Sequence, residues 1–123
     1  MKKVYSIKEA ELVSPSVTIG QFFLKLLHAA TNGHILHLQT KSYSEHKALQ
    51  AYYENLPDLV DNIIEQWQGA YQTIVEYPSN YEAPNSDALQ EVTAVRDFVV
   101  KNRAVVGDYT SIQNQVDELM SLL

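Results

Sequence analysis

The sequence predicts an all-α protein, an antiparallel four-helix bundle, and three observations support this prediction. Apolar residues recur every three or four positions in four separate segments, which is the period of an amphipathic helix. Polar stretches that contain proline or glycine separate those segments. The 123 residues are enough for one domain with its own hydrophobic core. We therefore expect an N-terminal arm over residues 1–13 and the bundle over residues 14–123.

The first predicted helix begins at Ser14-Pro15-Ser16 and ends near Thr40. A serine hydroxyl is a good helix cap, and proline is tolerated in the first turn. The apolar residues of this helix recur at helical intervals, and they are Phe22, Phe23, Leu26, Leu27, Ala30 and Leu38.

The second predicted helix begins near Tyr43, because Ser42 and Glu45 have the spacing of a capping box. The connection from the first helix is very short, so the two helices should be antiparallel neighbours. The apolar pattern continues to about Tyr77. Pro57 lies inside this helix and is expected to kink or split it, because proline has no amide hydrogen for the helical hydrogen bond.

Two more helices are predicted after a loop over residues 78–85. Ser86 is expected to cap the third helix, and either Thr110 or Ser111 is expected to cap the fourth. Gly107 should end the region between them. The inner positions are predicted to be Leu89, Val92, Val95, Phe98 and Val99 in the third helix, and Ile112, Val116, Leu119, Met120 and Leu123 in the fourth.

Composition excludes several classes of protein. The formal net charge of −6 argues against a nucleic-acid partner, because such proteins carry clustered lysine and arginine. The absence of cysteine excludes disulfides and thiolate metal sites. No apolar stretch approaches the roughly 18 residues of a membrane span, and the N-terminus lacks a signal-peptide core. We expect a cytoplasmic protein with no membrane partner.

The strongest functional signal is a set of histidines and carboxylates, namely His34, His37, His46, Asp61 and Glu65. Imidazole and carboxylate groups are common ligands of divalent metals. Asp61 and Glu65 are four residues apart, which places both on one face of a helix. The sequence therefore predicts a metal site in which either His34 or His37 acts together with His46.

Helix geometry divides this set into two halves. His46 and Asp61 are fifteen residues apart, which is about 22 Å along a helix at ~1.5 Å per residue. A single ion with bonds of about 2 Å cannot bind both residues of one chain. A two-fold axis that packs the second helix against its copy would bring His46 to Asp61 and Glu65 of that copy. We therefore expect a homodimer or a larger homo-oligomer.

A family resemblance follows from the segment HLQTKSYSEHKAL, residues 37–49, and from the spacing of His46, Asp61 and Glu65. These features resemble the Dps-type mini-ferritins of the ferritin-like superfamily, and in particular the short Dps-like proteins of tailed bacteriophages. The resemblance implies a ferritin-like bundle that binds iron, or another divalent metal, between subunits. It also implies weak ferroxidase activity and protection from oxidative stress.

One position favours a different function. Gln50 stands where the resembled family usually has a further carboxylate, and an amide is a much poorer iron ligand. The alternative hypothesis is a metal-free helical adaptor, or a phage-associated assembly protein, that keeps the fold without the chemistry.

Overall fold

The computed structural model describes residues 17–123, and the regular secondary structure of that part of the chain is all helix. The predicted arm and the predicted helix start at Ser14–Ser16 lie outside the described residues. The all-α class is confirmed for the described part. Its helices are α2 (Ile19–Gln39), α3 (Tyr43–Tyr71), α4 (Ala88–Asn102), a short 3-10 helix η1 (Arg103–Val106) and α5 (Thr110–Leu122).

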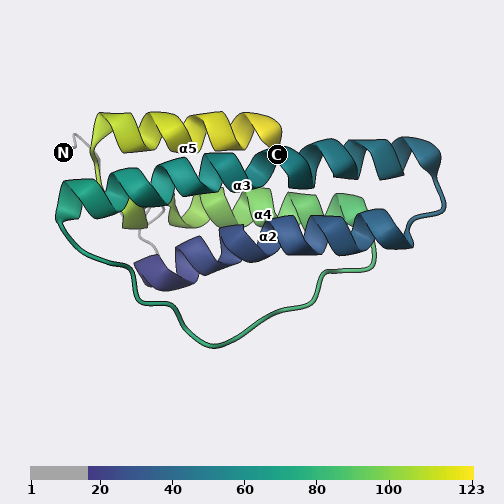
Figure 1. Ribbon diagram of the computed structural model, residues 1–123, viewed down its shortest axis with the longest axis horizontal. Coiled ribbons are helices and arrows are strands. Elements are labelled where there is room, and N and C mark those ends of the chain that lie inside the picture. The colour runs from purple at the N-terminus through teal and green to yellow at the C-terminus, as the bar shows by residue number, and fades with distance from the viewer. Residues whose placement is uncertain (1–16) are drawn as a thin grey trace.

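The four α-helices lie side by side along the long axis of the molecule (Figure 1). α2 packs against α3 and α4, and α3 also packs against α5. α2 and α5 run in one direction, whereas α3 and α4 run in the other (Figure 1). The parallel course of α3 and α4 requires a long connection between them, and residues 72–87, which we call the crossover, provide it.

The crossover follows the surface of α2 back to the α2–α3 turn. Its Glu76 carbonyl lies against Gly20 at the start of α2, where a side chain of any size would collide with it. Further along, the Asn32 amide donates to the Glu82 carbonyl at 3.1 Å. α4 then begins where Ala88 packs with Leu36 and Leu49, close to the turn. The sequence predicted a loop here but not its course.

Local capping chemistry explains where the first two helices begin. Thr18 caps α2: its hydroxyl accepts from the Gln21 amide at 3.1 Å, and the Gln21 side chain accepts from the Thr18 amide at 2.9 Å. This capping box fixes the first turn of α2 at Ile19. The predicted junction was confirmed, since α2 ends beside Thr40 and the Ser42 hydroxyl caps α3 by accepting from Glu45.

α3 is one continuous helix that contains Pro57. The proline does not split it, although the Tyr53 carbonyl loses its usual helical donor. The helix ends at Tyr71 rather than at the predicted Tyr77. The reason is local, because Gln72 adopts a left-handed conformation with φ 52°, and this geometry terminates a helix.

α4 and α5 differ from the prediction mainly at their first turns. Asp87, not Ser86, caps α4 and accepts from the Gln90 amide at 3.0 Å. The buried stripe then passes through Ala88 and Val95, which leaves the predicted core residue Leu89 75% exposed. α5 begins at Thr110 after Tyr109, whose side chain makes no capping bond. The predicted inner residues Ile112, Val116 and Leu119 are buried, whereas Met120 and Leu123 are partly buried.

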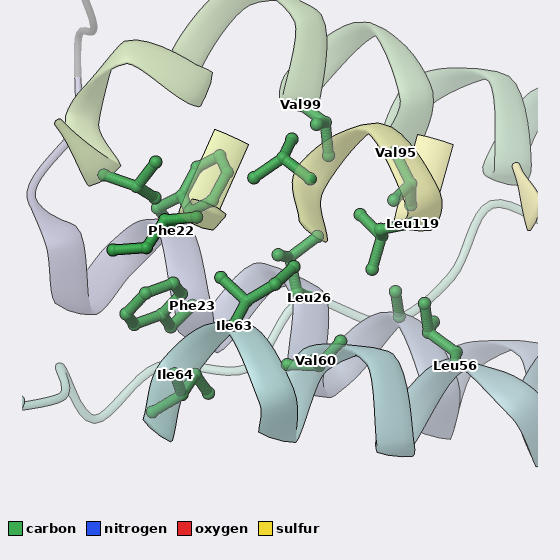
Figure 2. Packing of buried hydrophobic residues seen from close by; sticks show 14 of the residues in the cluster. Phe22, Phe23, Leu26, Leu56, Val60, Ile63, Ile64, Val95, Val99 and Leu119 are labelled. Carbon is green, nitrogen blue, oxygen red and sulfur yellow. The ribbon is translucent and has the colours of Figure 1, made fainter. Parts of the chain in front are cut away.

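The main hydrophobic core fills the part of the bundle away from the α2–α3 turn. Figure 2 shows side chains from α2, α3, α4 and α5 meeting there. Near the turn, the only separate buried apolar cluster of the described residues is the small group Leu36, Leu49 and Ala88. Packing near the turn therefore depends on contacts other than those between buried apolar side chains. The residues that carry most of the main core are Phe22, Phe23, Leu26, Leu56, Val60, Ile63, Val95, Val99 and Leu119.

Among the described residues, the helices are all too short or too polar to cross a lipid bilayer.

Candidate functional site

Two of the predicted metal ligands meet where α2 turns into α3. His37 lies in the last turn of α2 and is buried, and His46 lies in the first turn of α3 and is half-buried. The His37 Nδ1 donates to the His46 carbonyl at 2.8 Å, and the His46 Nδ1 donates to the His37 carbonyl at 3.1 Å. The two rings stack with centroids 3.6 Å apart and planes 27° apart. We call this reciprocal pair the histidine clasp.

The clasp completes the hydrogen bonding of a helix end. The last carbonyls of a helix have no donor within that helix, and the His37 carbonyl is one of them. The His46 ring supplies the missing donor from the next helix. Because a carbonyl oxygen only accepts, both Nδ1 atoms carry hydrogen, and in the neutral rings the Nε2 atoms hold the free lone pairs.

Two further aromatic rings extend the clasp along the surface. His34, which is exposed, stacks on Tyr53 with centroids 4.2 Å apart and planes only 8° apart. Tyr53 in turn meets His37 edge-on at 5.1 Å. All three predicted histidines therefore belong to one row of rings that joins α2 to α3. The sequence placed Tyr53 two turns after His46 on the same helix face, which was the signal for its position.

The predicted carboxylates do not join this row. Asp61 and Glu65 are exposed and lie further along α3, which is continuous from His46 to both. Within residues 17–123, no three side chains of histidine, aspartate or glutamate gather closely enough to hold a metal. The site between two subunits requires a second copy of the chain and stays a prediction.

The geometry of the clasp limits what it can bind. The lone pair of an imidazole nitrogen lies in the plane of its ring. Rings stacked 3.6 Å apart at 27° direct their lone pairs along nearly parallel planes, so an ion about 2.0–2.1 Å from one nitrogen lies outside the plane of the other ring. Chelation by His37 and His46 together would require one ring to rotate, which would break its bond to a carbonyl. The pair does not fit a single shared metal in this arrangement.

Next to the clasp, α2 and α3 approach each other closely at Gly33 and Tyr52. A methyl group on Gly33 would lie 2.7 Å from the Tyr52 ring, so only glycine leaves room for that ring. The Tyr52 hydroxyl is buried, and no described residue hydrogen-bonds to it. Burial raises the pKa of this phenol, and the negative charge of Glu91 raises it further. Glu91 is itself buried and accepts from the Asn85 amide at 2.7 Å.

The end of the bundle that carries the clasp exposes large apolar side chains. Leu38 is 70% exposed and Tyr43 is 76% exposed, one on each side of the turn. Tyr43 and His46 line a shallow depression together with the turn residues 40–42. We call the surface formed by Leu38, Tyr43 and residues 40–42 the hairpin end.

Comparisons with known proteins bear on the family of the chain. A family model described as a family of unknown function, DUF5856, matches residues 37–123, which include the clasp and every later helix. A protein of Enterobacteria phage T4, named the uncharacterized 14.6 kDa protein in the mobD-ri intergenic region, is 46% identical over 48 residues. The match covers 38% of this chain and 38% of the phage protein. No solved structure matches the chain.

These findings correct the resemblance drawn from the sequence. The family match is to DUF5856, and neither it nor the phage relative gives any evidence for a Dps-type or ferritin-like family. The misleading signal was the spacing of His46, Asp61 and Glu65. Any amphipathic helix repeats polar residues at such intervals, so a spaced pattern of three residues is weak evidence for a family. The phage origin of the relative agrees with the more general expectation of a phage-related protein.

Proposed function

This chain belongs to the DUF5856 family of unknown function, and we propose that it is a metal-free helical adaptor that docks on another protein through the hairpin end. The observation that carries this proposal is the histidine clasp. Its two N–H groups hold the turn closed, and its stacked rings are oriented for packing rather than for sharing an ion.

A rigid turn with exposed apolar side chains is suited to recognition. Leu38 and Tyr43 are held on either side of a turn that the clasp fixes, so little conformational freedom remains to be lost on binding. Tyrosine is enriched in interface cores, and clustered apolar exposure marks interaction surfaces. Lys41 lies in this surface in a chain whose net charge is −6, so an acidic partner surface would complement it.

The relative in phage T4 supports a phage-associated role, either as an adaptor or in assembly. A second copy of the chain is one partner that the hairpin end could bind. The inter-subunit metal site is the competing hypothesis, since the Nε2 atoms of the clasp are free to bind separate ions.

Site-specific photo-crosslinking tests the docking surface. A benzophenone amino acid is placed at Leu38 or Tyr43, with Asn114 on the exposed side of α5 as the matched control. We expect covalent adducts from the first two positions in cells during phage infection, and none from the control. An adduct of twice the mass of the chain identifies a second copy as the partner. Equal adduct patterns at all three positions, or none at any, would contradict the proposal.

Metal analysis tests the absence of a metal centre. Purified protein is dialysed against ferrous iron without oxygen and, separately, against zinc, beside the variants His46→Ala and Asp61→Ala. We expect wild type and both variants to retain no more metal than an unrelated acidic protein. Stoichiometric retention by the wild type that both variants lose would overturn the metal-free proposal and favour the inter-subunit site.

A further inference from the structure

A cavity of about 220 Å³ lies on the opposite flank of α2 from the clasp, between α2, the crossover and α4. Its lining combines apolar and charged side chains. Leu24 and Phe98 supply apolar surface, and Lys25, His28 and Glu82 supply ionisable groups. None of these residues takes part in the docking surface proposed above.

The wall formed by the crossover is fixed by a buried amide. Asn32 is only 4% exposed, and its Nδ2 donates to the Glu82 carbonyl at 3.1 Å. Its Oδ1 accepts from the Tyr81 hydroxyl at 2.5 Å. The Tyr81 ring also meets His28 edge-on with centroids 4.9 Å apart. These uncharged contacts hold the crossover against α2 at this point.

Two opposite charges face the same space. The Lys25 Nζ lies 3.4 Å from the Glu82 carboxylate, and the side chains are 28% and 72% exposed. An ion pair this long, with a solvated carboxylate, contributes little to stability. The Lys25 ammonium also lies 5.9 Å from the centroid of the Phe98 ring, so an aromatic surface stands directly beside the positive charge. The pair can thus open at small cost to receive a ligand that carries both charges.

We propose that this cavity binds a free α-amino acid with an aromatic or large aliphatic side chain. The ligand carboxylate would pair with the Lys25 ammonium, and the ligand ammonium would pair with the Glu82 carboxylate. Phe98 and Leu24 would pack against the ligand side chain. A zwitterion replaces one ion pair with two and leaves no charge unpaired, which a simple anion or cation cannot do.

Three compounds with the same phenyl group test this assignment on the full chain. L-phenylalanine carries both charges, 3-phenylpropanoate carries only the carboxylate, and phenethylamine carries only the ammonium. When phenylalanine is titrated in, the backbone amide chemical shifts of residues around Lys25, Asn32 and Glu82 should change. We expect it to bind about tenfold more tightly than either analogue, because each lost pair removes a charge-assisted hydrogen bond.

Two variants separate the charged contacts. Lys25→Met should weaken phenylalanine about tenfold and leave phenethylamine unchanged, and Glu82→Gln should weaken phenylalanine but not 3-phenylpropanoate. Lys47→Met and Glu54→Gln, at exposed positions outside the cavity, should change nothing. Equal affinity for all three compounds, or no saturable shift with phenylalanine, would overturn the proposal.

Discussion

The close contact between Gly33 and Tyr52 allows a prediction whose sign depends on the structure alone. Replacing glycine with alanine inside a helix normally stabilises it by about 1 kcal/mol. At Gly33, however, the new methyl group would lie 2.7 and 2.8 Å from two carbons of the Tyr52 ring and 3.4 Å from the Tyr53 Cβ. Overpacking of this kind costs about 1–3 kcal/mol. Gly33→Ala should therefore range from neutral to about 2 kcal/mol less stable than the wild type.

Gly69 provides a matched control, because it is also helical and a methyl group there would have no neighbour within 4 Å. Gly69→Ala should stabilise the protein by about 0.5–1 kcal/mol. The gain in helix propensity largely cancels when the two variants are compared, which leaves the overpacking cost of about 1–3 kcal/mol as their difference.

Urea unfolding followed by circular dichroism at the helix band measures both free energies of unfolding. The two variants should show the same dependence on urea concentration and different midpoints. A Gly33→Ala variant that is as stable as Gly69→Ala would refute the close packing of α2 on α3.

Three further predictions concern single side chains. His46→Ala should lower the free energy of unfolding by about 1–2 kcal/mol in urea, because the His37 carbonyl loses its donor and the stack is lost; no change would mean that the clasp does not close the turn. Burial raises the pKa of Tyr52 in the folded protein above its unfolded value of 10.0. The stabilisation of the folded state by neutral Tyr52 is therefore complete below pH 10.0 and is lost as the pH rises through the folded-state pKa. As the pH is raised into the alkaline range, the melting temperature of Tyr52→Phe should therefore fall less than that of the wild type. Parallel curves of melting temperature against pH would contradict the burial of Tyr52. Leu89→Ser should leave the free energy of unfolding nearly unchanged, whereas Val95→Ala should lower it by about 2 kcal/mol. The reverse order would mean that α4 packs into the core through its other face.

Local signals predicted the α2–α3 junction well. The Ser42 hydroxyl accepts from the Glu45 amide within one turn, so the first residue of α3 follows from the sequence alone. The other half of the predicted capping box was wrong, because the Ser42 amide donates to the Thr40 hydroxyl and not to the Glu45 side chain. The same short connection also places His37 and His46 at similar heights along the two antiparallel helices. The sequence did not indicate that each of the two rings would bond the backbone carbonyl of the other residue.

Long-range features could not be predicted in the same way. The buried stripe of α4 passes through Ala88, Val95 and Val99 and leaves Leu89 exposed, because the face that packs inward is set by the neighbouring helix α2. Asn32 lies among apolar neighbours on α2, and its partners come from the crossover about fifty residues later. Nothing in the local pattern indicates which distant segment will satisfy a buried amide.

The crossover has a consequence for the order in which contacts form. α2 and α3 are joined by residues 40–42 alone, so their contacts close a very short loop. The stacking of Phe22 on Phe98, in contrast, joins segments separated by the whole of α3 and the crossover. The molecule therefore consists of one local helical pair, α2 and α3, on which α4 and α5 pack through contacts between segments distant in sequence. The entropy cost of closing a loop rises with its length, and this cost must be overcome before α4 can pack on α2. Shortening the crossover should therefore change the folding rate more than the free energy of unfolding.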